Sequence, residues 1–331
     1  MTRRTTLALT CAAAGLVLSA CGTTQPSAEE ETDDTGDSTS EAASGPISVT
    51  DQAGRTVELD AAPERVVVLE WGQTESVLSL GVEPVGVADV DGYITWDTAE
   101  ELDPETTDVG VRGEPNLDAV FSENPDLVIV EATRGDPIIR QLEEYDVPIL
   151  VTEAANAEDP VGTMKETHLL IGQALGREDD ARADVEEFEA AVEEGREAID
   201  AADPENRSFT YVDAYADGAN VAIRPFGQGS QTGEIGEELG LENAWTGEVD
   251  DVYGLGNTDV EGMTAVSDST LLYTGTESDP WLSELERNPV WEDLAFVRED
   301  RVEEFPPGIW TFGGPGSSMQ LVDAYVAAFG G

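Results

Sequence analysis

The chain has 331 residues, enough for one large domain or two of medium size, and its formal net charge is −55. So acidic a surface repels phosphate groups, which argues against nucleic acid and anionic lipid headgroups as partners. With one histidine and two cysteines, the chain also offers few ligands for a soft or borderline metal ion.

The N-terminus predicts an export signal over residues 1–20. Two arginines, at positions 3 and 4, precede an apolar stretch that is too short to span a bilayer comfortably. The stretch ends in Leu-Ser-Ala-Cys at residues 18–21, which resembles a lipobox, where a peptidase cuts before the cysteine and its thiol receives a diacylglycerol. We therefore expect Cys21 to anchor the chain at the outer face of the cytoplasmic membrane. An ordinary secretory signal with a chance cysteine is the alternative.

Residues 21–46 predict a lipidated cysteine followed by a disordered acidic tether. Positions 22–46 hold small, polar and acidic residues and no large apolar one, so this segment cannot bury a core. Cleavage would remove Cys11 and acylation would occupy Cys21, so we expect neither a disulfide nor a cysteine-based metal site.

Residues 47–157 predict a first α/β lobe. Two short alternating runs, 47–51 and 55–59, flank Ala53-Gly54 and indicate a hairpin. Apolar runs and amphipathic segments then alternate at a spacing that implies a parallel sheet. The expected strands are 66–69, 85–88, 127–130 and 148–151, and the expected helices are 74–80, 116–122 and 136–144.

A long helical zone follows, at roughly residues 158–201. Apolar side chains at spacings of three and four, together with His168, form one face of a helix that Gly176 should end. We expect residues 158–175 to be the helix that joins two lobes.

Residues 176–331 predict the second α/β lobe. Its expected strands are 209–212, 221–223 and 271–273, and its later helices are 232–239 and 317–329. The predicted architecture is therefore two α/β lobes joined by one long helix.

Little in the sequence indicates catalysis. His168 lies on an apolar stripe, which favours a packed core or inter-lobe residue, and no nucleophile and orienting acid accompany it. The Gly-rich segment 227–233 lacks the spacing of a dinucleotide-binding loop and predicts a flexible strand-to-helix turn. No carboxylates have the spacing of a calcium loop.

Tryptophans stand out where predicted strands run into loops. In α/β proteins, ligands bind beyond the carboxyl ends of the strands, so aromatic residues and a few arginines there indicate a site for a bulky, partly apolar ligand. Trp281 and Trp291 lie in an amphipathic stretch and are expected to pack in the core. The loop tryptophans are Trp71, Trp96, Trp245 and Trp310.

An ordered series of short motifs extends over most of residues 47–331. The motifs are VVLEW at 67–71, VGVAD at 85–89, YITW at 93–96, GVRGEPNL at 110–117, NAWTGE at 243–248 and IWTFGG at 309–314. The series resembles the hydroxamate (ferrichrome-type) siderophore-binding proteins of ABC importers. This resemblance implies class III binding-protein architecture, with two lobes, a rigid connecting helix and a ligand cleft between the lobes.

The resemblance also implies roles for individual residues. Arg112 matches the arginine that hydrogen-bonds the iron-chelating oxygens of the siderophore. Arg134 and Thr133 stand where the family can place a hydrogen-bonding tyrosine, and Arg134 and Arg224 are candidate additional contacts for an anionic ligand. The candidate cleft aromatics are Trp71, Trp96, Trp245, Trp310, Phe312 and, with a one-residue difference in spacing, Tyr253.

Charge favours a hydroxamate ligand. A ferric trihydroxamate is formally neutral, whereas a ferric tricatecholate carries about three negative charges and would call for a basic cluster. Iron is expected only as the ferric siderophore complex, with no cofactor held by the protein itself. Ferric citrate, ferric catecholate, cobalamin and haem stay open, although haem usually takes a His, Tyr or Met ligand.

Docking to the importer's permease is the second function that the resemblance implies. Asp118 and Glu261 match the positions at which such proteins present one acid per lobe to permease arginines, and solvated surface acids are the alternative. The protein is expected to be a monomer and not an enzyme. An exported siderophore-modifying hydrolase and a purely structural surface protein are the competing classes.

Overall fold

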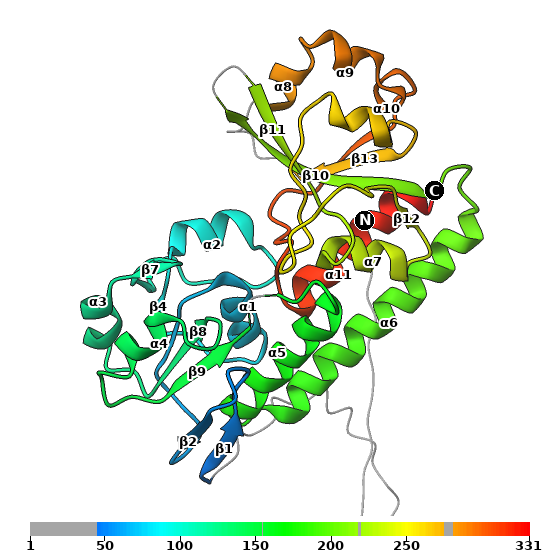
Figure 1. Cartoon of the computed structure of the whole chain (residues 1–331). Coiled ribbons are helices and arrows are strands. Elements are labelled where there is room, and N and C mark those ends of the chain that lie inside the picture. The colour runs from blue at the N-terminus through cyan, green and yellow to red at the C-terminus, as the bar shows by residue number, and fades with distance from the viewer. Residues whose placement is uncertain (1–44, 154, 218–219, 275–280) are drawn as a thin grey trace, which may run out of the picture. The chain divides into compact units, whose positions relative to one another are not determined.

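The computed structural model describes residues 45–153, 155–217, 220–274 and 281–331, which belong to one compact unit of the chain. The expected signal peptide, Cys21 and the tether up to residue 44 lie outside the described residues. The architecture is α/β, as predicted, with two separate five-stranded sheets and helices around them (Figure 1).

The first sheet is entirely parallel, with the order β5-β4-β3-β8-β9. Its central strands are continuous apolar runs and are buried, which fits a sheet covered on both faces. Beside it, β1 (Ile47–Thr50) and β2 (Thr56–Leu59) form the predicted hairpin. The sheet strands are β3 (Val66–Val68), β4 (Gly86–Val87), β5 (Thr107–Asp108), β8 (Leu127–Glu131) and β9 (Ile149–Thr152).

Side-chain caps set where the helices of this sheet begin. The Glu70 carboxylate accepts the Trp71 N–H, so α1 starts three residues earlier than predicted. Asp89, at φ 59°, caps α2, a helix that the sequence analysis missed. The elements are α1 (Trp71–Ser79), α2 (Val90–Trp96), α3 (Leu117–Ser122) and α4 (Pro137–Leu142), with a small hairpin of β6 (Gly110–Val111) and β7 (Glu114–Pro115).

Two long helices follow the first sheet. Gly176, at φ 68°, ends α5 (Pro160–Leu175) as predicted, and α6 (Glu178–Ala202) begins two residues later. α5 contacts α1 and β1, which lie beside the first sheet, and also α7 and α11, whereas α6 packs mainly along α11 (Figure 1). His168 is fully buried in α5 and its Nε2 lies 3.1 Å from Asp184, which confirms a packed position.

The second sheet has the order β11-β10-β13-β14, with β12 beside β10. Only β10 and β11 are antiparallel. The sequence analysis missed β14 and the short helices α8 to α10. The elements are β10 (Ser208–Asp217), β11 (Asn220–Pro225), α7 (Gln231–Glu238), β12 (Glu242–Asn243), η1 (Gly262–Val266), β13 (Thr270–Thr274), α8 (Trp281–Leu285), α9 (Pro289–Asp293), α10 (Ala295–Arg298), β14 (Val302–Phe305) and α11 (Pro315–Phe329).

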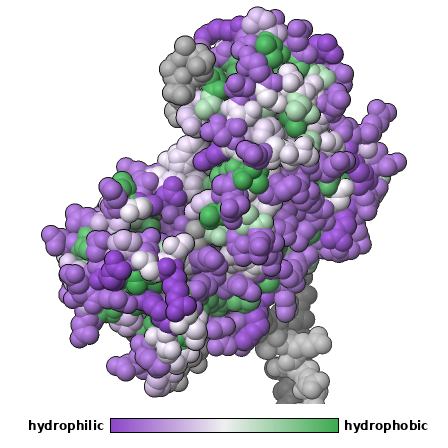
Figure 2. Space-filling view, viewed as in Figure 1, coloured by the Kyte–Doolittle hydropathy of each residue, from purple (hydrophilic) through white to green (hydrophobic). Residues whose placement is uncertain are grey.

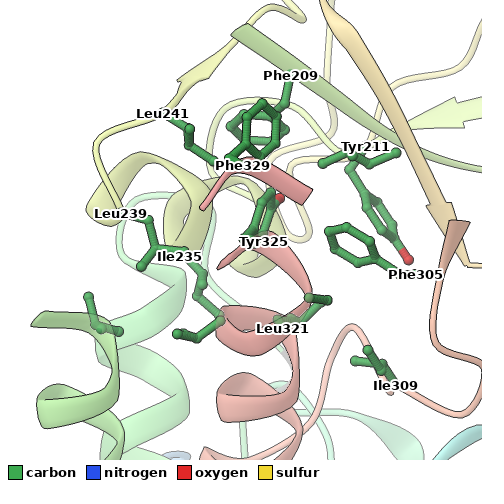
Figure 3. Packing of buried hydrophobic residues seen from close by; sticks show 14 of the residues in the cluster. Phe209, Tyr211, Ile235, Leu239, Leu241, Phe305, Ile309, Leu321, Tyr325 and Phe329 are labelled. Carbon is green, nitrogen blue, oxygen red and sulfur yellow. The ribbon is translucent and has the colours of Figure 1, made fainter. Parts of the chain in front are cut away.

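An aromatic core fixes α11 against this sheet (Figure 3). The ring of Tyr325 lies 5.2 Å from both Phe209 and Phe305, edge to face in each case. Trp281 and Trp291 are buried in a neighbouring cluster, as predicted. The visible molecular surface is largely hydrophilic (Figure 2), as expected from the composition.

A buried carboxylate joins α1, beside the first sheet, to α11, beside the second. Glu75 of α1 is 1% exposed and accepts the N–H groups of Gly314 and Ser317, both at 2.9 Å, and the Ser317 hydroxyl at 2.7 Å. These donors form the N-terminus of the fifteen-residue helix α11, where a negative charge is favoured. We refer to this arrangement as the Glu75 cap.

A second buried acid lies beside the Glu75 cap. Asp97 is 1% exposed, and the Ser317 hydroxyl lies 3.4 Å from its Oδ1. Burial, and then the charge of Glu75, raise the pKa of Asp97 to about 9. Asp97 therefore holds a proton at neutral pH, which lets two carboxyl groups share one dry site.

This proton makes stability depend on pH. Unfolded Asp97 ionises near pH 4, whereas the folded group stays protonated up to about pH 9, so the folded state binds more protons between these values and loses stability as pH rises. Asp97→Asn cannot titrate. We expect it to raise the free energy of unfolding at pH 8 by roughly 1–3 kcal/mol, with the gain shrinking toward pH 4.

Thermal melts followed by circular dichroism across this pH range would measure the effect. Asp60→Asn, at an exposed position, is the matched control and should follow the parent curve. If Asp97→Asn melts like the parent at every pH, Asp97 is not protonated in the fold.

Candidate functional site

A cavity of about 240 Å³ lies between the first sheet and loops of the second. Glu70 and Glu131 reach it from the carboxyl ends of β3 and β8, which are adjacent parallel strands, so their side chains emerge at one sheet edge. The other lining residues come from segments around the second sheet and from the β6–β7 hairpin. The full lining is Glu70, Arg112, Glu131, Arg224, Tyr253, Leu255, Trp310 and Phe312.

Arg112 packs against two tryptophans, Trp71 and Trp310, whose rings also contact each other edge to face at 4.8 Å. Its guanidinium carbon lies 3.8 Å from the ring centroid of Trp71 and 5.1 Å from that of Trp310. Its Nη1 donates to Glu70 Oε1. Stacking and the ion pair together orient the guanidinium. Because it has five N–H donors, others remain for a ligand.

An aromatic wall formed by Trp310, Phe312 and Tyr253 faces this arginine. The rings of Trp310 and Phe312 lie 5.3 Å apart, and those of Phe312 and Tyr253 lie 5.4 Å apart. Rigid flat side chains such as these present apolar area at little entropic cost.

Backbone hydrogen bonds hold the loop that carries Tyr253. The carboxylate of Asp250 accepts the N–H groups of Val252, Tyr253 and Leu255, and these bonds lower the pKa of Asp250 against the opposing effect of burial. Gly254 has a φ of 65° and lies close to Gly229. A Cβ on Gly254 would be only 2.4 Å from the carbonyl carbon of Gly229. The Gly-rich segment is thus the predicted strand-to-helix turn, but it is close-packed against this loop.

Arg224 lines the cavity and forms an ion pair with Asp213. Its Nε donates to Asp213 Oδ1 at 2.8 Å and its Nη2 donates to Oδ2. The two residues face each other across β10 and β11. Burial raises the pKa of Asp213 despite this bidentate partner.

Glu131, the second carboxylate of the cavity, receives hydrogen bonds from two neutral side chains, Tyr253 and Gln73. Tyr253 Oη donates to its Oε1 and Gln73 Nε2 to its Oε2, both at a long 3.4 Å. Burial, and then the charge of Glu70, raise the pKa of Glu131 to about 7, against the opposing effects of these two donors and Arg112.

The structure brings together five of the predicted ligand-binding residues. Arg112, Arg224, Tyr253, Trp310 and Phe312 all line the cavity.

The other predicted ligand-binding residues do not line it. Trp71 is 4% exposed within a cluster of buried residues and stacks on Arg112, so it supports the arginine. Trp245 is 7% exposed and packs in the core of the second sheet, where Gly227 and Gly256 lie against its ring. Trp96 ends α2 instead of lying in a loop. Arg134 is exposed and lies near Gly54 of the first hairpin.

Sequence reasoning missed three lining residues as site residues: Glu70, Glu131 and Leu255. The one distinguishing signal of the two glutamates is their position at the ends of two apolar strand runs. The candidate docking acids lie elsewhere: Asp118 in the first turn of α3 and Glu261 just before η1, both exposed.

The described residues contain neither a grouped metal-ligand set nor a membrane-spanning helix. Within residues 45–153, 155–217, 220–274 and 281–331, no three His, Cys, Asp or Glu side chains are grouped so as to hold a metal ion. In the same part of the chain, no helix has the length and apolar character needed to cross a membrane.

The sequence of this chain is similar to those of known binding proteins. The sequence profile of a family described as periplasmic binding protein matches residues 66–308. The iron(3+)-hydroxamate-binding protein FhuD of Escherichia coli is 26% identical over 81% of this chain and 88% of its own length. The Fe(3+)-citrate-binding protein YfmC of Bacillus subtilis is 28% identical over 79% of this chain and 78% of its own.

A solved structure shares the fold. The siderophore-binding protein FhuD from Vibrio cholerae, crystallised with Fe³⁺-Desferal, superposes with a TM-score of 0.72 at 21% identity, over 81% of this chain and 98% of that chain. This likeness confirms the predicted binding-protein fold.

Proposed function

We propose, since the chain belongs to the periplasmic binding protein family, that it captures a ferric siderophore, with a hydroxamate complex favoured, and delivers it to an ABC importer. The observation that carries the proposal is the arginine of the cavity, which stacks on Trp71 and lies beside the aromatic wall that begins at Trp310. The named functions of the relatives support it.

The chemistry of the cavity suits a neutral chelate. The oxygens of a ferric trihydroxamate carry partial negative charge, which the remaining N–H donors of Arg112 can satisfy. The carbon framework of the ligand would lie on Trp310 and Phe312. Iron enters only as part of this substrate.

Ferric citrate is the second candidate, because one relative is named for it. The charge of the cavity counts against it. Arg112 and Arg224 are each paired with a carboxylate, so an anionic complex would compete with Glu70 and Asp213 for them. The family consists of binding proteins, which counts against a hydrolase.

Titration of tryptophan fluorescence tests the proposal. Ferric hydroxamate should quench the soluble 22–331 fragment saturably, and Arg112→Ala should weaken binding tenfold or more, which corresponds to a loss of about 1.4–3 kcal/mol from a charge-assisted hydrogen bond. Arg140→Ala, at an exposed position on α4, is the matched control. Tighter binding of ferric citrate would replace the hydroxamate assignment, and unchanged affinity of Arg112→Ala would remove this residue from the site.

We also propose that a lipid on Cys21 anchors the protein at the outer face of the cytoplasmic membrane. The support is the lipobox-like sequence at residues 18–21 and the absence of large apolar residues between 22 and 46.

Cys21→Ala removes the acceptor thiol. We expect the variant to appear in the medium or to stay unprocessed, because the export signal is unchanged while the lipid has no attachment point. Membrane fractionation and electrophoretic mobility report this. A variant that stays membrane-bound at the parent's mobility would contradict the anchor.

Asp118 and Glu261 are proposed to dock a monomer of this protein on the permease. Both are exposed, and they lie beside different sheets, as a two-point contact requires. Their charges would attract arginines of the partner.

The double variant Asp118→Ala, Glu261→Ala should take up several-fold less iron in cells and keep the ligand affinity of the parent, because neither residue lines the cavity. Exposed Asp60 and Glu105, both changed to Ala, make a control with the same charge change. Parental uptake by the first variant would assign both acids to the solvated surface.

A further inference from the structure

The ionisable carboxylates and guanidiniums that line the cavity are equal in number, two glutamates and two arginines, but they are not all paired with one another. Arg112 is paired with Glu70, and Arg224 with Asp213. Glu131 has no such partner: among the described residues, no lysine or arginine nitrogen lies within 4.0 Å of its carboxylate. Arg224 is paired with Asp213, which is not a lining residue, so the Glu131 carboxylate has no arginine of the cavity left to neutralise it.

We infer that Glu131 is a cation subsite, and that the protein prefers ferric siderophores bearing a protonated amine over neutral or anionic complexes of the same framework. This inference rests on the proposed function and adds a charge selectivity to it. It identifies Glu131 as a residue that determines specificity.

The position of Glu131 suits this role. It is the last residue of β8, where a side chain emerges at the edge of the sheet into the cavity. Tyr253 and Gln73 orient the carboxylate, but at 3.4 Å both hydrogen bonds are long, and two oxygens can accept more donors than these. A ligand ammonium brings three donors and the missing positive charge.

Electrostatics also favours an incoming cation. Charged Glu131 is disfavoured by burial and by repulsion from Glu70, and Arg112 offsets this only in part. A ligand cation beside Glu131 opposes the repulsion directly, and beside a largely buried carboxylate its attraction is screened less than at the open surface. An added negative charge in the ligand would have the opposite effect.

A matched pair of ligands separates this selectivity from binding itself. Ferrioxamine B is a linear ferric trihydroxamate with a terminal primary amine, and its N-acetyl derivative keeps the chelate but loses the positive charge. Both are titrated against the 22–331 fragment at pH 8 in 0.5 M NaCl, which screens the long-range attraction of the acidic surface. We expect the amine form to bind about tenfold tighter or better.

Glu131→Gln keeps the shape of the side chain and removes the charge, so the ratio of the two affinities should fall to about one. Glu105→Gln, exposed and outside this cavity, makes the same change in net charge and should keep the ratio of the parent. Equal affinity of the parent for the two ligands would overturn the cation subsite and leave the proposed function standing. Binding of neither ligand would overturn the hydroxamate function, and the subsite with it.

Discussion

The Glu75 cap is the interaction on which the rest of this structure depends. Its carboxylate belongs to α1, which begins at the Glu70 and Trp71 side of the cavity, and its donors begin α11. The segment just before α11 contains Trp310 and Phe312. One buried charge therefore fixes the part of the aromatic wall formed by Trp310 and Phe312 relative to Arg112, through a contact between residues 239 apart in the chain.

Close backbone packing reinforces this connection. A Cβ on Gly72 would meet the Phe312 carbonyl at 2.7 Å, and one on Gly313 would meet the Glu75 carboxylate at 2.4 Å. Both positions thus need glycine, because any side chain there would prevent α1 and the segment before α11 from packing this closely against each other. The protonated state of Asp97 follows from the same crowding, because a second negative charge beside Glu75 would be costly in so dry a site.

The sequence predicted most of the framework and part of the site. Apolar runs such as 127–130 and the glycine at 176 mark their elements by local chemistry alone. Helix α2 was missed because it starts directly after a two-residue strand, at an aspartate with positive φ. Burial of Trp71 and Trp245 depends on neighbours distant in sequence, and no local pattern reports it. Glu131 could not stand out among 71 acids, because only the fold shows that it lines the cavity.

The long sequence separation of the Glu75 cap has a consequence for how the protein folds. Glu75 and Ser317 are 242 residues apart, so the carboxylate finds its donors only when the end of the chain is available. Contacts of such range are slow to form, because their loop-closure entropy must be overcome first. The first sheet can assemble early, but the cavity is complete only after the final helix docks. A nascent chain, or one truncated before α11, would therefore have an unfinished site and an exposed acidic seam.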